Sequence, residues 1–389
     1  MPDNRDFDIV AFGASGFTGR LVAEYLAEHY PSGVKWAMAG RRLEKLASVR
    51  DEIKAPASIP LIAADSSNAA ELAALARRTK VVLTTVGPYQ LYGEGLVAAC
   101  AEAGTDYVDL CGEPAWMRQM IDRYDAKAKA SGARIVFSCG FDSIPFDLGV
   151  QFVQAHTKAQ TGAPAPRVKG RVRKMKGTFS GGTAASLKAT MAAAAQDPMI
   201  LGYLKDHFAL TPGFAGPKQP HGMKPEHDDA LSMWVAPFVM AAINTRNVHR
   251  TNALTGHAYG QDFLYDEMVV TGPGDKGKAI AEKMASDKSM MSSDGPKPGE
   301  GPSKAERDAG HFDLLFLAEC KDGRSFRAAV TGDKDPGYGC TSKMIAESAL
   351  CLVRDVPSGP GGVTTPGAVM GAPLLKRLVA NAGMTFKIE

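Results

Sequence analysis

Three glycines spaced three residues apart, Gly13, Gly16 and Gly19, stand between a short apolar run and an amphipathic segment. Residues 7–12 are rich in β-formers and too few for a helix, which indicates a buried strand. The apolar spacing of residues 21–26 indicates a helix. A strand, a glycine turn and a helix N-terminus together make an anion site, because free N–H groups and the helix dipole favour negative charge there. The stretch therefore predicts a cradle for a dinucleotide pyrophosphate.

Each glycine in this turn has a separate physical task. Gly13 permits the tight turn, Gly16 lets a pyrophosphate approach the backbone, and Gly19 lets the helix pack closely on the strand. The expected cradle comprises seven consecutive residues: Gly13, Ala14, Ser15, Gly16, Phe17, Thr18 and Gly19. The spacing departs from the G-x-G-x-x-G of the standard fingerprint, so a plain structural turn is the alternative interpretation.

The end of the next expected strand, residues 34–39, indicates which dinucleotide binds. An acidic residue at this place would hydrogen-bond the ribose 2′-hydroxyl of NAD(H) and repel a 2′-phosphate. The sequence instead has Gly40 followed by Arg41 and Arg42, and a guanidinium suits a phosphate. These residues favour NADP(H) as the cofactor, with a solvated basic helix start as the alternative.

Other candidate cofactor contacts lie at the ends of later strands, where ligands of open α/β sheets gather. Asp65 follows the expected strand of residues 59–64. It is expected either to bond the adenine amino group or to cap the helix of residues 69–76. The remaining candidates are at the ends of the strands 80–86 and 134–138: Thr85, Val86, Gly87, Pro88, Cys139 and Gly140.

Short apolar runs alternate with helical patterns through the first part of the chain, and the connections are short. This rhythm predicts an α/β fold, with a Rossmann-type, doubly wound parallel sheet in residues 1–147. Beyond it the pattern changes, and residues 168–178 alternate as in an antiparallel strand. We therefore expect a second, α+β domain over residues 148–340, which binds the substrate and forms the interface of a homodimer.

The composition limits the classes of protein to which the chain can belong. A chain of 389 residues is long enough for two domains, and its 45% hydrophobic and 22% charged residues are typical of globular proteins. The net charge is +3 without a dense basic block, so nucleic acid is not an expected partner. The six cysteines lack metal-ligand spacing, which predicts reduced thiols in a cytoplasmic protein and no metal site. No apolar run reaches about 18 residues, and no signal peptide is expected.

Two further stretches are candidates for the border of a substrate site. Residues 233–243 are apolar, and a core helix is the expected structure. Lining an acyl-chain cavity and contacting a membrane surface peripherally are the alternatives. Residues 286–309, rich in Pro, Gly, Ser and charge, are expected to form a flexible loop, and a lid over a site is one interpretation.

Five motifs occur in order along the chain: Gly-Ala-Ser-Gly-Phe-Thr-Gly (13–19), Ala-Gly-Arg (39–41), Val-Gly-Pro-Tyr (86–89), Tyr-Val-Asp-Leu-Cys-Gly-Glu (107–113) and Gly-Phe-Asp-Ser-Ile-Pro (140–145). Together they resemble the saccharopine-dehydrogenase-like oxidoreductases, and most closely the branch of trans-acting enoyl reductases of mycobacterial lipid synthesis. The resemblance implies an NADPH-dependent reductase with a Rossmann domain and an α+β domain. It also implies that residues 341–389 form C-terminal helices that pack back on the Rossmann domain.

In the enoyl reductase branch, hydride goes to the β-carbon of an α,β-unsaturated thioester on a polyketide synthase product. The resemblance therefore implies an unsaturated acyl or lipid-like substrate, with a polyketide or fatty-acid synthase carrier as a candidate partner. Such a reduction needs a donor for the developing enolate oxygen and a proton source for the α-carbon. The candidates are Tyr89, Asp142, Ser143 and Tyr338. The alternative for Tyr89 is packing, and for Asp142 or Ser143 it is capping the helix of residues 146–155.

Two other functions stay open at this point. An imine or carbonyl reductase acting on an amino-acid-like substrate would use arginines to hold substrate carboxylates, and Arg171 and Arg173 are candidates for that role. A non-catalytic protein that binds NADPH and a lipid surface is the second alternative.

Overall fold

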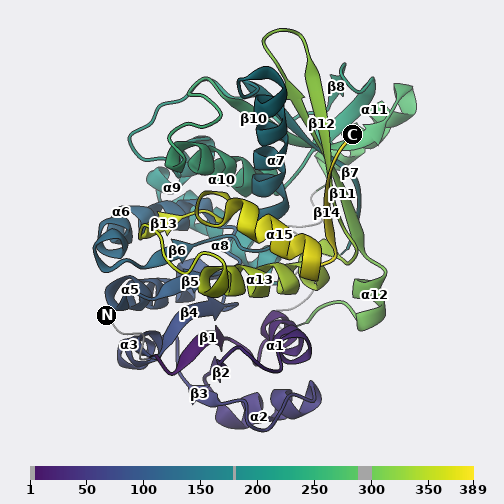
Figure 1. Ribbon diagram of the computed structural model, residues 1–389. Coiled ribbons are helices and arrows are strands. Elements are labelled where there is room, and N and C mark those ends of the chain that lie inside the picture. The colour runs from purple at the N-terminus through teal and green to yellow at the C-terminus, as the bar shows by residue number, and fades with distance from the viewer. Residues whose placement is uncertain (1–4, 178–180, 288–299) are drawn as a thin grey trace.

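The structure, a computed structural model, describes residues 5–177, 181–287 and 300–389. Two seven-stranded sheets lie within these ranges. Figure 1 shows the first sheet in the lower half of the molecule and the second at the upper right, with C-terminal helices across the middle. Residues 288–299, half of the loop expected over 286–309, lie outside the described residues.

The first sheet is parallel throughout and has the strand order β3-β2-β1-β4-β5-β6-β13. Its strands are β1 (Phe7–Phe12), β2 (Trp36–Gly40), β3 (Leu61–Ala63), β4 (Thr79–Thr84), β5 (Asp106–Val108), β6 (Arg134–Val136) and β13 (Gly362–Thr364). The first six strands follow the order 3-2-1-4-5-6 of dinucleotide-binding sheets. The predicted α/β fold with a Rossmann-type parallel sheet is confirmed.

Helices connect these strands and cover the sheet. They are α1 (Phe17–His29), α2 (Leu43–Glu52), α3 (Ala69–Arg77), α4 (Tyr89–Tyr92), α5 (Glu94–Ala103), α6 (Pro114–Ser131) and α7 (Ile144–Thr161). In Figure 1, α3, α5 and α6 lie along one side of the sheet, and α1 lies on the other side beside a helix from the C-terminal part of the chain.

The strand β6 ends earlier than the strand predicted over residues 134–138, and one buried carboxylate lies just beyond the ends of β5 and β6. Asp109 accepts hydrogen bonds from the backbone N–H groups of Cys111 and Ser138, each at 2.9 Å, and from the Tyr107 hydroxyl at 2.9 Å. Beyond β5 and β6, the N–H groups of Cys111 and Ser138 therefore bond a side chain, while the Cys139 N–H still donates to the Asp109 carbonyl at 2.7 Å. Part of the 107–113 motif is thus structural, because it shapes the sheet edge.

The second sheet is mixed, with the order β14-β12-β11-β7-β10-β9-β8. Its strands are β7 (Arg167–Lys176), β8 (Glu226–Asp228), β9 (Met233–Pro237), β10 (Leu264–Gly272), β11 (His311–Glu319), β12 (Ser325–Gly332) and β14 (Met384–Ile388). The accompanying helices are α8 (Gly181–Gln196), α9 (Pro198–Lys205), α10 (Ala241–Leu254), α11 (Gly274–Ser286) and α12 (Lys304–Asp308). Only the pair β7 and β10 runs parallel among the described pairs of this sheet.

The core helix predicted over residues 233–243 is wrong for its first half. Residues 233–237 are the strand β9, which pairs antiparallel with β10, and a helix begins only at Ala241. A short apolar run does not distinguish a strand from a buried helix by its periodicity. Pairing with β10 on one side and β8 on the other decides the outcome here.

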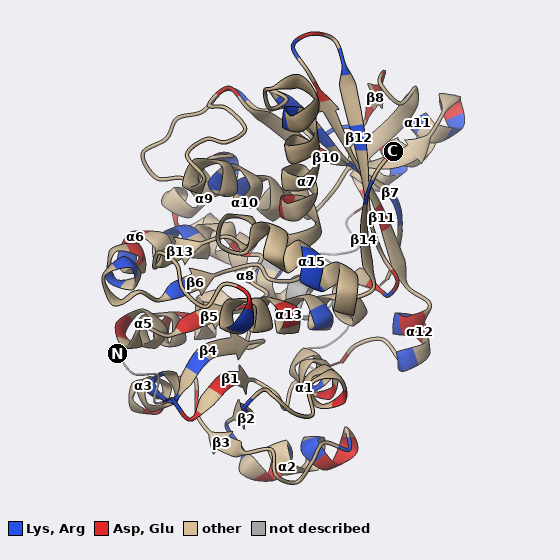
Figure 2. Cartoon of the chain, viewed as in Figure 1, with Lys and Arg blue, Asp and Glu red and all other residues tan. Residues whose placement is uncertain are grey.

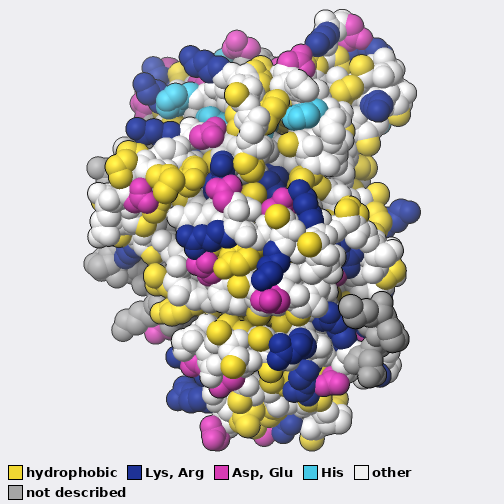
Figure 3. Space-filling model, turned by 90° about the vertical axis from the view of Figure 1, so that its left-hand side faces the viewer, with side chains coloured by type: hydrophobic (Ala, Val, Ile, Leu, Met, Phe, Trp, Pro, Cys, Tyr) yellow, Lys and Arg dark blue, Asp and Glu magenta, His cyan; other side chains and the backbone are white. Residues whose placement is uncertain are grey.

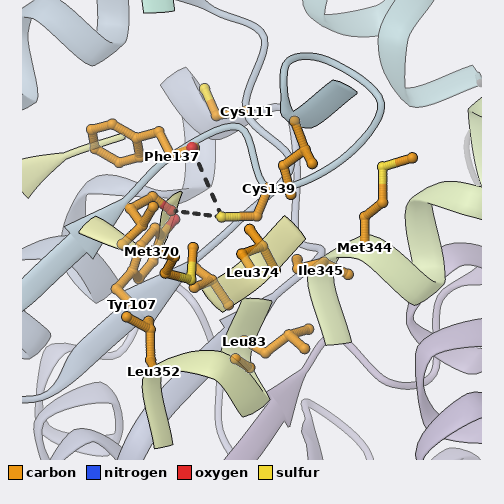
Figure 4. Close-up of a cluster of buried hydrophobic side chains, with 14 of the residues drawn as sticks. Leu83, Tyr107, Cys111, Phe137, Cys139, Met344, Ile345, Leu352, Met370 and Leu374 are labelled. Atoms are coloured by element: carbon orange, nitrogen blue, oxygen red, sulfur yellow. Dashed lines mark hydrogen bonds between the residues drawn. The ribbon is translucent and has the colours of Figure 1, made fainter. Parts of the chain in front are cut away.

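Residues 341–389 contribute to both sheets. They form α13 (Thr341–Arg354), β13, α14 (Pro366–Val369), α15 (Gly371–Asn381) and β14. The helix α13 contacts α1, β4 and β5. Figure 4 shows Met344, Ile345 and Leu352 of α13 in one buried cluster with Leu83 of β4 and Tyr107 of β5. Domain boundaries after residues 147 and 340 stay a prediction.

The glycine turn has the geometry that its sequence predicts. Gly13 has φ +86°, a conformation that glycine adopts without strain. A Cβ at Gly19 would overlap the carbonyl oxygen of Gly13, so only glycine lets α1 start this close to the end of β1. A Cβ at Gly16 would meet only that same oxygen, at 3.3 Å.

Charge and hydrophobicity are spread over the surface. Figure 2 shows both signs of charge on the helices of both halves of the molecule. The face in Figure 3 has hydrophobic side chains interspersed with lysines and arginines. No helix among the described residues has both the length and the apolar content that spanning a bilayer requires.

We expect Gly19→Ala to destabilise the protein by about 1–3 kcal/mol, the usual cost of overpacking. The added methyl group has backbone atoms as neighbours, so α1 must move away from β1. Thermal unfolding of the purified variant measures the loss. Gly16→Ala is the matched control and should unfold close to the wild-type temperature. Equal stability of Gly19→Ala and wild type would contradict this account of the turn.

Candidate cofactor and substrate site

A cavity of about 630 Å³ runs along the C-terminal ends of the first sheet and reaches the second sheet. This volume suits a small-molecule ligand, since such pockets usually measure about 300–1,000 Å³. Between β2 and β6 the wall crosses four strand spacings, or about 19 Å at ~4.8 Å each. The cavity is therefore long enough to hold two different chemical environments.

The glycine turn forms the centre of the wall. Five of its seven residues line the cavity: Gly13, Ser15, Gly16, Phe17 and Thr18. Gly16 is the N-cap of α1, no side chain caps the helix, and its first turn contains no acidic residue. The first-turn amides and the positive end of the helix dipole are therefore available to an anion. Ala14 and Gly19 are buried beneath the turn and do not line the cavity.

Two cations line the wall at the β2 end, Arg41 and Lys45. Both side chains are exposed. Arg42, predicted as a second phosphate contact, is the N-cap residue of α2 and lies outside the cavity lining. Sequence reasoning missed Lys45. Its position four residues after Arg41, in the first turn of α2, is the signal that could have identified it.

Asp65 does not cap α3. The N-cap is Asn68, whose side chain accepts from the N–H groups of Ala70 and Glu71. The Asp65 carboxylate instead accepts from Ser67, at 2.9 Å from its N–H and 2.8 Å from its hydroxyl, and these bonds lower the pKa of Asp65. Asp65 is not part of the cavity wall, and its contact with adenine stays a prediction.

The residues predicted as cofactor contacts at the ends of β4 and β6 divide into two groups. Thr85, Val86, Gly87 and Gly140 line the cavity, whereas Pro88 and Cys139 do not. The Cys139 thiol lies 3.6 Å from the Val136 carbonyl oxygen, in the cluster of Figure 4. Burial raises the pKa of this thiol well above its ordinary value, so Cys139 is an inert packing residue.

Tyr89 lines the cavity, but its hydroxyl already has two backbone partners. It accepts from the N–H of Leu110 at 3.0 Å and donates to the Thr84 carbonyl at 3.4 Å. The ring packs on Trp116. Glu113 is the last residue of the 107–113 motif. Its carboxylate accepts from the N–H groups of Tyr89 and Gln90 and from the Ser186 hydroxyl. These contacts favour the packing interpretation of Tyr89.

Asp142 and Ser143 are neighbours with different environments. Ser143 occupies the N-cap position of α7, yet its side chain makes no capping bond. Its hydroxyl is fully buried and accepts from the Asn247 amide of α10 at 2.8 Å, away from the cavity lining. Asp142 lines the cavity, and its buried Oδ1 has no hydrogen-bond partner among the described residues. Burial raises the pKa of Asp142 to about 7.

Tyr338 closes the cavity near the glycine turn. It lies in the π-helical turn η2 (Pro336–Cys340), and its ring meets Phe17 edge-on, with the centroids 4.8 Å apart. The Asp335 carboxylate accepts from the N–H groups of Tyr338 and Gly339 and so fixes this turn. The Tyr338 hydroxyl lies 3.4 Å from the carbonyl oxygen of Glu300.

The end of the cavity opposite the cations is apolar. Phe238, Val239, Met240 and Ile243, all from the stretch 233–243, line it together with Met175 of β7. The second half of this stretch therefore forms part of a cavity wall, which was one of the alternatives considered for it. Val239 and Met175 are also exposed, so the apolar wall continues to the surface.

The two arginines considered for substrate carboxylates are bound to acidic residues of the protein. Arg171 is buried and pairs with Asp228 at 2.7 Å and Asp266 at 2.9 Å. Arg173 pairs with Asp313 and Glu389. Neither arginine lines the cavity.

We expect Arg41→Ala and Lys45→Ala each to weaken NADPH binding while leaving NADH binding unchanged. A hydrogen bond to a charged group contributes about 1.5–3 kcal/mol, which corresponds to roughly 10- to 100-fold in Kd. Fluorescence titration with each nucleotide measures the difference. Arg42→Ala is the matched control, because Arg42 is exposed and lies outside the lining. Equal losses of NADPH affinity in all three variants would contradict the assignment.

The comparisons with known proteins agree with this geometry. Residues 9–136 match the family model described as the saccharopine dehydrogenase NADP binding domain. Apo saccharopine dehydrogenase (L-Glu forming) from Saccharomyces cerevisiae has the same fold, with a TM-score of 0.55 over 98% of this chain and all of that one, at 11% identity.

Relatives in sequence extend over the whole chain. A Mycobacterium tuberculosis protein, provisionally named a trans-acting enoyl reductase, is 40% identical over 98% of this chain and 97% of its own length. The trans-acting enoyl reductase of Mycobacterium ulcerans is 37% identical over 96% of each chain. The chain therefore belongs to the family of these trans-acting enoyl reductases, and its residues 9–136 form a saccharopine dehydrogenase NADP-binding domain.

Proposed function

We propose that the protein is an NADPH-dependent enoyl reductase that acts on an unsaturated acyl thioester. The observation that carries this proposal is the two-sided cavity. One end has an uncapped helix N-terminus and two cations, and the other end is apolar and continues to the surface. A polar dinucleotide and an acyl chain each fit one of these environments.

The cofactor is assigned to the sheet side of the cavity. The amides at Phe17 and Thr18 would hold the pyrophosphate, with Gly16 allowing close approach. Arg41 and Lys45 would hold the 2′-phosphate. The strand ends at Thr85–Gly87 and Gly140 would border the nicotinamide half. When bound there, NADPH supplies the hydride that reaches the β-carbon of the substrate.

Asp142 is the proposed proton donor. As hydride adds to the β-carbon, the electron pair of the double bond moves toward the α-carbon and the thioester oxygen. The Asp142 carboxyl gives its proton to the α-carbon, becomes a carboxylate and regains a proton from water. Its place in the wall and its raised pKa suit this role. Tyr338 stays a candidate donor to the thioester oxygen, and Ser143 is not part of this proposal because its buried hydroxyl faces Asn247.

The acyl thioester is proposed to arrive on a partner. The curated relatives are named as acting in trans, and an apolar wall that reaches the surface would admit a chain attached to a polyketide or fatty-acid synthase carrier. A homodimer and a peripheral contact with a membrane stay predictions. The imine reductase alternative loses its main support, because Arg171 and Arg173 are paired with acidic residues away from the cavity.

The proposal predicts NADPH oxidation with trans-2-enoyl thioesters, followed by the loss of absorbance of the reduced cofactor. Asp142→Asn should lower kcat by about 10²- to 10⁴-fold, the usual contribution of a general acid. NADPH binding should not change. Because the acid form is the active one, wild-type turnover should fall as the pH rises through about 7. Turnover of imines or carbonyls with none of enoyl thioesters would refute the proposal.

We expect Val239→Glu to raise KM for long-chain enoyl thioesters by about tenfold or more, because a charge in an apolar wall opposes binding of the chain. The Kd of NADPH should stay constant. Val379→Glu on α15 is the matched control, since Val379 is similarly exposed, at 48% against 42%, and lies outside the lining. Steady-state kinetics over a series of chain lengths provide the measurement. An identical KM for both variants would exclude this wall as the acyl site.

A further inference from the structure

A strap of three residues, Glu300, Gly301 and Pro302, crosses over the side chain of Phe17. A Cβ added at Gly301 would lie only 2.4 Å from a ring carbon of Phe17, so a residue with a side chain could not pass this close to the ring. Phe17 lines the cavity and is the first residue of α1, directly after the N-cap Gly16. The strap therefore rests on a residue of the proposed cofactor cradle.

Hydrogen bonds attach the strap through its first and last residues. The carbonyl oxygen of Glu300 lies 3.4 Å from the Tyr338 hydroxyl, and both residues line the cavity. The carbonyl oxygen of Pro302 accepts from the Arg307 guanidinium at 2.7 Å. The strap is thus tied to the turn η2 at one end and to the helix α12 at the other.

The helix α12 is in turn fixed to the segment that contains η2. The N–H of Asp335 donates to the Arg307 carbonyl oxygen at 3.0 Å, and the Asp308 carboxylate pairs with Lys334 at 2.8 Å. A helix of five residues is too short to be stable alone, so its position depends on such contacts. They place the Arg307 side chain relative to the cavity wall.

Two guanidinium groups and a second aromatic ring surround the Phe17 ring. The Cζ atom of Arg307 lies 5.7 Å from the ring centroid, and that of Arg20 lies 5.5 Å from it. Tyr338 meets the ring edge-on, with the centroids 4.8 Å apart. Cations over an aromatic face and edge-on rings are both attractive arrangements. A larger residue at position 301 would therefore displace the strap rather than the ring.

The strap also brings a positive charge to the end of α1 where an anion is expected. Arg20 is paired with Glu52, whereas the Arg307 guanidinium bonds the neutral carbonyl oxygen of Pro302. The Asp335 carboxylate of this region already accepts two backbone N–H groups of η2. The charge of Arg307 thus adds to the positive end of the helix dipole.

Resting on the proposed cofactor site, we propose that the strap retains the dinucleotide. Gly301 on the Phe17 ring and Arg307 over the same ring hold the first turn of α1, where the pyrophosphate would bind, and cover it. Both are positioning residues, because they act on the cofactor through Phe17. NADPH and NADH share the pyrophosphate and differ only in the 2′-phosphate, which is assigned to Arg41 and Lys45. The strap should therefore slow the dissociation of both nucleotides to the same degree.

The substitution Gly301→Ala tests this proposal, because the added methyl group should lift the strap from Phe17. The dissociation rates of NADPH and NADH should both rise by about tenfold or more, since affinity differences between related complexes lie mostly in dissociation. Stopped-flow fluorescence, with excess NADP⁺ added to displace the reduced nucleotide, measures the rates. Gly359→Ala is the matched control, because Gly359 is exposed and a Cβ there would have no neighbour within 4 Å.

Two results for Gly301→Ala would overturn the proposal. One is a dissociation rate equal to that of Gly359→Ala, and the other is faster release of NADPH alone. In the Phe17→Ala background, Gly301→Ala should add little, because the ring that it displaces is gone. An additive effect would show that Gly301 acts independently of Phe17 and would also contradict the proposal, whereas a general loss of stability would not produce this coupling.

A second variant keeps the test open if Gly301→Ala does not fold. Arg307→Gln removes the cation over Phe17 and should also speed the release of both nucleotides, whereas Lys304→Gln, an exposed neighbour on α12, should not. Equal rates in these two variants would contradict the role of Arg307. These measurements use no acyl substrate. The strap can therefore fail the test while enoyl thioesters are reduced, and it can pass the test when they are not.

Discussion

The structure depends on one close contact between backbones. Because Gly19 has no side chain, α1 begins directly against the Gly13 carbonyl, at the end of the central strand β1. That contact sets the first-turn amides of α1 into the wall of the cavity. The cations Arg41 and Lys45, the strand ends of β4 and β6 and the ring of Tyr338 are arranged around this point. A larger residue at position 19 would displace the element on which all of them are centred.

The chemistry proposed for the site needs contributions from both sheets. The first sheet provides the anion cradle and the cations, while the second sheet and the helix α10 provide the apolar wall. The buried helix α10 connects them, because its side chains reach Ser143 on one side and Glu267 on the other. This arrangement is the one expected for cofactor enzymes, in which the protein orients the reactants, excludes water and supplies a proton.

Much of the first sheet could be predicted from sequence, since its strands and helices are local patterns and its glycines have local causes. The turn at Gly13 and the close packing at Gly19 follow from the absence of a side chain. Features decided by distant partners could not be predicted. The strand β9 depends on β10, and the role of Ser143 depends on Asn247. Asn68 as the cap of α3 was within reach of the sequence, because it directly precedes the helix that was expected from residue 69.

The edge strands β13 and β14 have a consequence for how the protein is made. Residues 362–364 complete one border of the first sheet, and residues 384–388 complete one border of the second. During synthesis, the strands β6 and β12 leave the ribosome long before these partners exist. Until then each presents an open row of backbone donors and acceptors, the kind of border that invites pairing with another chain. Native assembly of both sheets is therefore a late event, and a nascent chain is most exposed to aggregation just before residues 362–388 emerge.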